Sequence, residues 1–160
     1  MKQLLVTDAL CSGCRACEVA CVARHDGRFG TASARIRVFK DERLGVDSPR
    51  VCRLCADAPC VPACSIGALS RGEATRVVHV AADQCTSCAA CSPACPYGAL
   101  AIHPRTGMPL ICDLCDGAPA CVTRCVTGAL VYGEADDAVD PSRLTSLTGG
   151  RGESRQDSRA

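Results

Sequence analysis

Short apolar runs separated by polar loops make up most of the chain. β-Branched and leucine residues at Gln3 to Val6, Arg35 to Phe39 and Arg76 to Val80 predict three short strands. The tripeptide Gly-Ala-Leu recurs at 67–69, 98–100 and 128–130, and each copy predicts a backbone turn followed by another short strand. The longest apolar stretch is far too short to cross a membrane, so no membrane span is expected.

Cysteines divide the chain into four repeats. They form four groups of four: Cys11, Cys14, Cys17, Cys21; Cys52, Cys55, Cys60, Cys64; Cys85, Cys88, Cys91, Cys95; and Cys112, Cys115, Cys121, Cys125. Each group begins C-x2-C and ends C-x3-C, while the middle gap is two, four, two and five residues. The second, third and fourth groups each lead into a Gly-Ala-Leu copy, so the repeat extends beyond the cysteines and sets the architecture.

Composition shows that something other than a large apolar core holds the chain together. Its 160 residues include no Trp, two Phe and two Tyr, but sixteen Cys. That cysteine content indicates either disulfides or metal. The segment from Met1 to Leu10 has no secretory h-region and no twin-arginine pair, which favours a cytoplasmic protein whose paired thiols bind metal. Export together with a signal-bearing partner stays open.

The cysteine spacing favours iron-sulfur clusters over zinc. The run from Cys85 to Pro96 matches C-x2-C-x2-C-x3-C-P, the bacterial two-cluster ferredoxin pattern, in which the last cysteine binds the neighbouring cluster. The other three groups lack the proline, and two have a longer middle gap, but each still offers three thiolates within one loop. Zinc ribbons also use C-x2-C pairs, yet zinc has no need for three cysteines packed so closely.

Charge argues against a nucleic-acid partner. The formal net charge is +1, and the basic residues are scattered among nearly as many acidic ones. Four clusters held by four thiolates each would add roughly −8. The loaded protein would then be strongly acidic.

These motifs resemble a known family. The runs Cys17-Glu-Val-Ala-Cys21, Arg35-Ile-Arg-Val-Phe39, Val51-Cys-Arg-Leu-Cys55 and Cys112-Asp-Leu-Cys115 resemble the electron-transfer subunits of molybdenum and tungsten oxidoreductases. Within that family they are most similar to the small iron-sulfur subunit that accompanies tungsten aldehyde oxidoreductase. The resemblance covers residues 1 to 132.

The resemblance implies four 4Fe-4S clusters in a nested pairing of the first group with the fourth and of the second with the third. The implied ligand sets are Cys11, Cys14, Cys17 with Cys125; Cys112, Cys115, Cys121 with Cys21; Cys52, Cys55, Cys60 with Cys95; and Cys85, Cys88, Cys91 with Cys64. Spacing alone leaves open a sequential pairing of the first group with the second and of the third with the fourth.

The expected fold is α+β with little regular secondary structure: nested two-cluster ferredoxin-like modules, with short β-hairpins and short helices around the clusters. One domain spans 1–132, with an outer module from 1–21 and 112–132, an inner module at 52–100 and an insertion at 22–51. A polar tail follows at 133–160. Within the tail, Asp140 and Pro141 predict a short helix over 142–147.

No catalytic constellation accompanies the cysteines. The three histidines are not spaced to replace a cysteine ligand, so structural or surface roles are expected for His25, His79 and His103. Arg15, Arg53 and Arg124 lie inside cysteine groups, where they either offset cluster charge or are solvated.

The predicted function is therefore non-catalytic electron transfer as a subunit of a tungsten or molybdenum pterin enzyme, with a flavin subunit or a soluble ferredoxin as a further partner and self-association through the tail. The alternative is a free polyferredoxin shuttle, or an electron-transfer subunit of a hydrogenase, formate dehydrogenase or carbon monoxide dehydrogenase.

Overall fold

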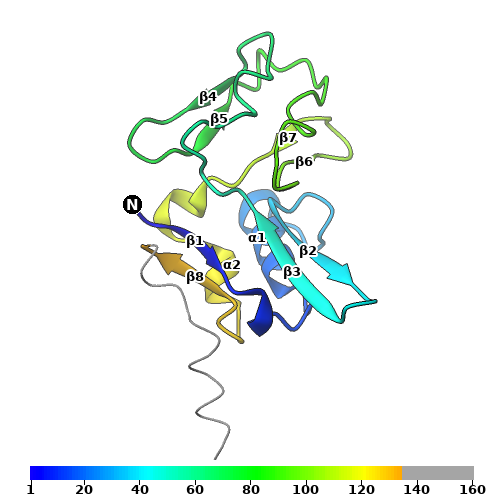
Figure 1. The fold of residues 1–160 in the computed structure, drawn as a ribbon. Coiled ribbons are helices and arrows are strands. Elements are labelled where there is room, and N and C mark those ends of the chain that lie inside the picture. Colours follow the sequence, from blue (N-terminus) through cyan, green and yellow to red (C-terminus); the bar gives the residue numbers. More distant parts are fainter. Residues whose placement is uncertain (135–160) are drawn as a thin grey trace, which may run out of the picture.

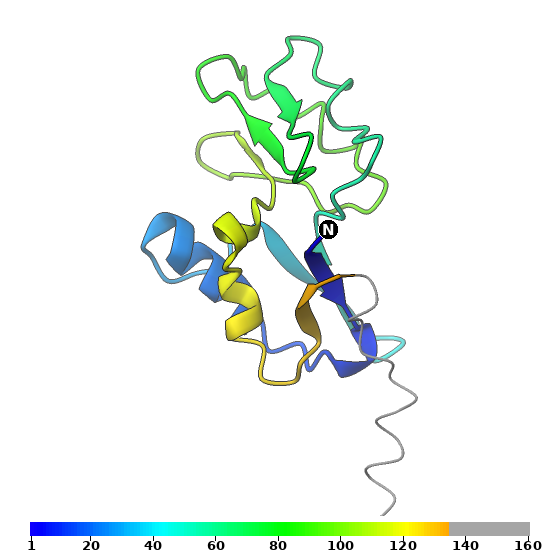
Figure 2. The ribbon, with the colours of Figure 1, turned by 90° about the vertical axis from the view of Figure 1, so that its left-hand side faces the viewer.

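The computed structural model describes residues 1–134 as two lobes (Figure 1). Regular structure is sparse, as expected, and consists of β1 (Gln3–Val6), η1 (Asp8–Leu10), α1 (Ala16–Asp26), β2 (Ile36–Asp41), β3 (Val46–Val51), β4 (Leu69–Arg71), β5 (Val78–Val80), β6 (Ala101–Ile102), β7 (Pro109–Leu110), η2 (Leu114–Gly117), α2 (Ala120–Thr123) and β8 (Leu130–Gly133). The first lobe contains β1, β2, β3, β8 and both α-helices, whereas β4 to β7 form the second (Figures 1 and 2).

Two antiparallel strand pairs frame the first lobe. Strand β1 pairs with β8, so segments from the two ends of the described chain lie side by side. Strands β2 and β3 form a hairpin in which Ile36 lies opposite Val51. Alternation along β2 directs Ile36 and Val38 into the core and leaves Phe39 exposed. The predicted strand at Arg35 to Phe39 is therefore confirmed, starting one residue later and continuing to Asp41.

Helix α1 was not predicted from the sequence. It begins at Ala16 inside the first cysteine group and ends before Gly27, whose backbone adopts a left-handed φ of 64° and whose N–H donates to the Ala23 carbonyl. Glycine is the usual residue at such a helix C-terminus. The helix buries Cys17, Cys21 and Val22. The segment 22–51 thus begins within a helix and contributes core side chains to the first lobe.

The second lobe consists of two small hairpins, β4 with β5 and β6 with β7. The predicted order of a Gly-Ala-Leu turn followed by a strand is confirmed here and at β8. The strand predicted from Arg76 begins only at Val78, because Arg76 has a left-handed φ of 56° within the turn before β5.

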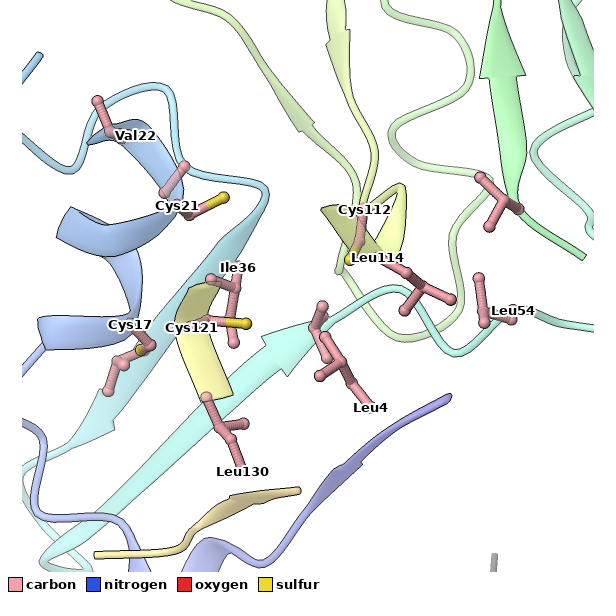
Figure 3. Close-up of a cluster of buried hydrophobic side chains, with 14 residues drawn as sticks. Leu4, Cys17, Cys21, Val22, Ile36, Leu54, Cys112, Leu114, Cys121 and Leu130 are labelled. Carbon is pink, nitrogen blue, oxygen red and sulfur yellow. The ribbon is translucent and has the colours of Figure 1, made fainter. Parts of the chain in front are cut away.

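Each lobe has its own hydrophobic core, and cysteines contribute to both. In the first, Cys17 and Cys21 project from α1 and Cys121 from α2 into the same interior, with Leu130 of β8 beneath them (Figure 3). The second core is smaller and centres on Leu69, Val78, Leu100 and Ile111, around Cys91.

A buried acid connects α1 to the hairpin. The Glu18 side chain is 4% exposed, and its Oε1 accepts a hydrogen bond of 2.6 Å from the Val38 backbone N–H. A buried carboxylate with this partner fixes the helix against β2, because leaving either group unpaired inside the core is costly.

The predicted helix at 142–147, and the tail beyond residue 134, lie outside the described residues. Within residues 1–134, no helix is both long enough and apolar enough to span a membrane.

Candidate metal centres

Cysteines distant in sequence converge around three cavities. One is lined by Cys52, Cys55, Cys60 and Cys95, a second by Cys21, Cys112, Cys115 and Cys121, and a third by Cys64, Cys85, Cys88 and Cys91. The rest of each lining is mostly apolar. In each case three thiols come from one group and the fourth is the last cysteine of another group.

The remaining four cysteines also approach one another. Cys125 lies close enough to Cys11 to raise its pKa, after the larger effect of burial, and Cys14 acts on Cys11 in the same direction. Cys11 and Cys14 likewise act on Cys17. Three thiols of the first group therefore gather with the last thiol of the fourth. All sixteen cysteines are free thiols in the structure.

The four cysteine loops share one unusual backbone feature. The residue just before the second cysteine of each group has a left-handed φ: 65° at Gly13, 50° at Leu54, 57° at Ser87 and 60° at Leu114. Outside glycine this conformation is strained and collects at functional sites. Its recurrence at the same repeat position indicates that each loop is shaped by what it surrounds.

Backbone amides donate hydrogen bonds to cysteine sulfur atoms, both within a cysteine loop and from a neighbouring segment. The Gly13 N–H donates to Cys11 Sγ at 3.4 Å, and the Arg35 N–H donates to Cys21 Sγ at 3.3 Å. Amides of this kind favour a thiolate over a thiol. At Cys125, burial acts to raise the pKa, but hydrogen bonds from the Thr127 hydroxyl and from nearby amides outweigh it, so the pKa of Cys125 is lowered.

At several other thiols, burial is the main influence on the pKa. It raises the pKa of Cys17 to about 12, of Cys112 to about 12 and of Cys60 to about 11, with neighbouring thiols adding to the effect. Such thiols carry their protons at neutral pH unless a cation replaces them. The pockets are thus built for a positively charged group that binds sulfur.

One set of thiols has a polar surround that the sequence did not predict. His25 Nε2 lies 3.7 Å from Cys115 Sγ and 3.5 Å from Asp113 Oδ1. Asp113 also forms an ion pair with Arg35 and accepts a hydrogen bond of 3.0 Å from the Cys115 N–H. His25 is thus a half-buried side chain beside a thiol of the set, and the structural or surface role expected for it stays a prediction. The only hint in the sequence is its place one turn beyond Cys21.

This polar network shifts two pKa values. Burial, then the positive charge of Arg35, lowers the pKa of His25. Burial acts to raise the pKa of Asp113, but the Cys115 amide and Arg35 outweigh it and lower that pKa. The side chains therefore form an ion pair of Arg35 and Asp113 beside an imidazole that is neutral at pH 7.

The donor chemistry fits 4Fe-4S clusters. Each set offers four soft sulfur donors, the number that such a cluster requires, and apolar walls with amide donors are the environment in which thiolate clusters are held. The C-x2-C loops supply three sulfurs locally, and a distant segment supplies the fourth. This chemistry agrees with the spacing argument made from the sequence.

Comparison with known proteins also supports 4Fe-4S clusters. A family model described as a 4Fe-4S dicluster domain matches residues 44–135. The polyferredoxin-like subunit of aliphatic sulfonate oxidoreductase from Pyrococcus furiosus is 44% identical over 122 residues, covering 76% of this chain and 70% of that one. The electron transport protein HydN of Escherichia coli is 36% identical over 177 aligned positions, covering 92% and 94%.

Among solved structures, the active site complex BamBC of benzoyl coenzyme A reductase, as isolated, contains a similar chain. The match has a TM-score of 0.50 at 27% identity and covers 92% of this chain and 86% of that one. Taken with the converging thiols, these relatives show that the chain belongs to the family of 4Fe-4S dicluster, ferredoxin-type electron-transfer proteins.

Proposed function

We propose that this chain carries four 4Fe-4S clusters and relays electrons between the active-site subunit of a tungsten or molybdenum oxidoreductase and a second redox subunit or carrier. The first candidate for that enzyme is an aldehyde oxidoreductase. The observation that carries the proposal is the convergence of sixteen thiols into four sets of four, each completed by a cysteine from another group.

The proposed ligand sets are the nested ones. Cys11, Cys14, Cys17 and Cys125 hold the first cluster; Cys112, Cys115, Cys121 and Cys21 the second; Cys52, Cys55, Cys60 and Cys95 the third; and Cys85, Cys88, Cys91 and Cys64 the fourth. Clusters supply one-electron chemistry when bound, and the protein holds them, screens them from water and directs amides at their sulfur ligands.

The sets follow one another as a line. Thiols of the first and second sets are near enough to interact electrostatically, as Cys17 does with Cys121. Cys112 of the second set interacts in the same way with Cys52 of the third. The third and fourth sets are interlocked, because each takes its fourth cysteine from the other's loop. Electrons would pass stepwise along this line.

The two ends of the line reach the surface. Cys14 in the first set and Cys88 in the fourth are exposed, whereas all four cysteines of the second set are buried. A relay needs two accessible ends, and the exposure of Cys14 and Cys88 fits that need. In the proposed relay, substrate chemistry belongs to the active-site subunit of the partner enzyme.

Relatives support an oxidoreductase partner. One is a polyferredoxin-like subunit of an aliphatic sulfonate oxidoreductase, and another lies in the active site complex of benzoyl coenzyme A reductase. A separate flavin subunit or a soluble ferredoxin would then take or supply the electrons at the other end.

Iron analysis of the purified chain tests the cofactor assignment. About sixteen iron atoms per chain are expected, and Cys88→Ala should lower that to about twelve. Ser87→Ala is the matched control, since it changes the neighbouring residue but no ligand. Zinc in place of iron, or full iron content in the Cys88→Ala protein, would refute the assignment.

Co-purification tests the partner. The complex should contain a pterin-bearing subunit with tungsten or molybdenum in amounts close to one per chain. A brown protein that purifies alone as a stable monomer would instead support the free polyferredoxin shuttle.

A further inference from the structure

Aromatic side chains in this protein are largely kept out of its cores. The chain has four aromatic residues, and three of them, Phe29, Phe39 and Tyr97, are exposed at 93%, 54% and 51%. Phe39 and Tyr97 come from different lobes. Each is paired with an arginine: the Arg50 guanidinium lies 4.0 Å from the centre of the Phe39 ring, and that of Arg53 lies 5.9 Å from the centre of the Tyr97 ring.

The hairpin explains why Phe39 and Arg50 share a face. Phe39 lies opposite Ser48 in the β2 and β3 register, and Arg50 follows two residues along β3, so all three point away from the core. Ser48, Arg50, Arg53 and Tyr97 line a groove of about 280 Å³ between the end of β3 and the loop from Pro96 to Gly98. We call Phe39, Arg50, Arg53 and Tyr97 the arginine-aromatic patch.

In the described part of the chain, no carboxylate pairs with either arginine of the patch. Among residues 1–134, neither guanidinium lies within 4.0 Å of an acidic group, and no acidic residue lines the groove. Arginine and exposed aromatic rings are the residues enriched at the centres of protein interfaces. Unpaired positive charge beside them calls for carboxylates on the occupant.

The surrounding charge sharpens this preference. With four clusters bound, the protein would be strongly negative overall, by roughly −7. An acidic partner would be repelled by most of such a surface and attracted where two unpaired arginines stand together. The patch would therefore decide where an acidic protein makes contact.

The patch lies over one thiol set. Arg53 and Tyr97 line the cavity formed by Cys52, Cys55, Cys60 and Cys95 as well as the groove. Arg53 directly follows Cys52, and Tyr97 comes two residues after Cys95. A redox centre bound in this groove would face the third cluster of the line. It would not face the first or the fourth cluster, which form the exposed ends of the line.

We propose that the arginine-aromatic patch is the docking surface for an acidic redox protein, and that electrons pass there between this protein and the third cluster. The patch is thus an access point in the middle of the line. One electron moves from the reduced centre of the partner to the oxidised cluster, or back, and no bond forms or breaks. The inference rests on the proposed cluster loading.

The test measures electron transfer from a reduced, small, acidic two-cluster ferredoxin to the oxidised, fully loaded chain by stopped flow. In Arg50→Glu/Arg53→Glu, we expect the second-order rate constant at low salt to fall by about tenfold or more, and the difference to shrink as salt is added. Phe39→Ala/Tyr97→Ala should lower the rate at every salt concentration.

The matched control is Arg28→Glu/Arg105→Glu. It makes the same change in net charge at another polar groove, which Arg28 and Arg105 line with Phe29. The control should change the rate by less than about twofold. A rate that falls equally in both double variants, or in the control alone, would overturn the assignment, as would an acidic ferredoxin that does not react with the unaltered chain.

Two further measurements keep the result interpretable. A basic haem protein as electron acceptor from the reduced chain should react no more slowly with Arg50→Glu/Arg53→Glu than with the unaltered chain. Iron content close to sixteen atoms per chain shows that a variant has folded and loaded, and Arg50→Gln/Arg53→Gln replaces the charge reversal if it does not. Low iron in the unaltered chain would count against the proposed function, whereas normal iron with an unchanged rate counts against the patch alone.

Discussion

Each lobe contains sets of four thiols, but the two lobes are stabilised differently. The larger core holds fourteen buried residues, which come from both α-helices, both strand pairs of the first lobe and the adjoining loops (Figure 3). The core of the second holds six, with no helix around them among the described residues. The first lobe therefore has packing of its own, and the second depends more heavily on the groups its cysteines bind.

Cluster removal should produce the largest difference in behaviour between the two lobes. When iron and sulfide are stripped at neutral pH, the amides of β4 to β7 should lose all measurable protection from hydrogen exchange, because the small core there depends on thiolate bonds for support. The amides of β1, β8 and the β2–β3 hairpin should keep residual protection, but the cooperative melting of the whole chain should disappear. An apo chain that still melts cooperatively would contradict this.

Cluster assembly should depend on pH in both lobes. Burial raises the pKa of Cys17 and Cys112 to about 12, against about 11 for Cys60 in the second lobe. These thiols stay protonated below those values, so bound iron must displace protons, and lower pH opposes loading. Reconstitution at limiting iron should rise severalfold, by about two- to fivefold, between about pH 7 and pH 9. The visible absorbance of Cys→Ala variants confined to one lobe should rise with the same slope for either lobe, because these thiols are all protonated across this pH range.

Side chains that bond to backbone should matter more in the first lobe. Removing the buried Glu18 carboxylate in Glu18→Ala leaves the Val38 N–H unpaired in the core and should lower the free energy of unfolding by about 1–3 kcal/mol. Glu18→Gln, which keeps an acceptor, should lose less.

The counterpart in the second lobe is Ser92, whose Oγ donates to the Leu100 carbonyl at 3.0 Å. Because this bond is only partly buried, Ser92→Ala should cost about 0.5–1 kcal/mol. Denaturant titration of the loaded proteins gives both values, and equal losses would show that the lobes are equally packed.

Replacing a glycine that has a left-handed φ should produce the smallest difference in stability between the two lobes. Gly27 has a φ of 64° with no atom within 4 Å of an added Cβ, so Gly27→Ala should cost only the backbone strain, about 1 kcal/mol. Gly107 has a φ of 71°, and an added Cβ would come within 2.7 Å of the Ser87 Cβ. Gly107→Ala should therefore cost more and should also disturb the third cysteine loop. Thermal melts with a matched iron assay would detect both effects, and an iron loss in Gly27→Ala would not be expected.

Local features were predictable because their causes are local. The strand at Gln3 to Val6 and the strands after each Gly-Ala-Leu turn follow from short-range propensity and from glycine's backbone freedom. The left-handed position before each second cysteine was missed, although Gly13 marks it in the first group. In the other groups the position is occupied by Leu54, Ser87 and Leu114, and these residue types do not predict a positive φ.

Helix α1 was missed because its apolar face is made largely of cysteines, which the sequence analysis had already assigned to metal. Its signals were Gly27 at the C-terminus and the spacing of Cys17, Cys21 and Val22 along one face.

By itself, the sequence determined the inventory: sixteen thiols, in four loops that can each present three of them at once, and few large apolar side chains to form a core. The tertiary structure alone decided which thiols of distant loops line the same cavity, and which side chains surround each set. His25 meets Cys115 across 90 positions, and Arg35 meets Asp113 across 78. Arg53 and Tyr97 are brought together only when the second and third loops pair. Spacing governs what one loop can hold, whereas contacts between distant loops depend on how the whole chain packs.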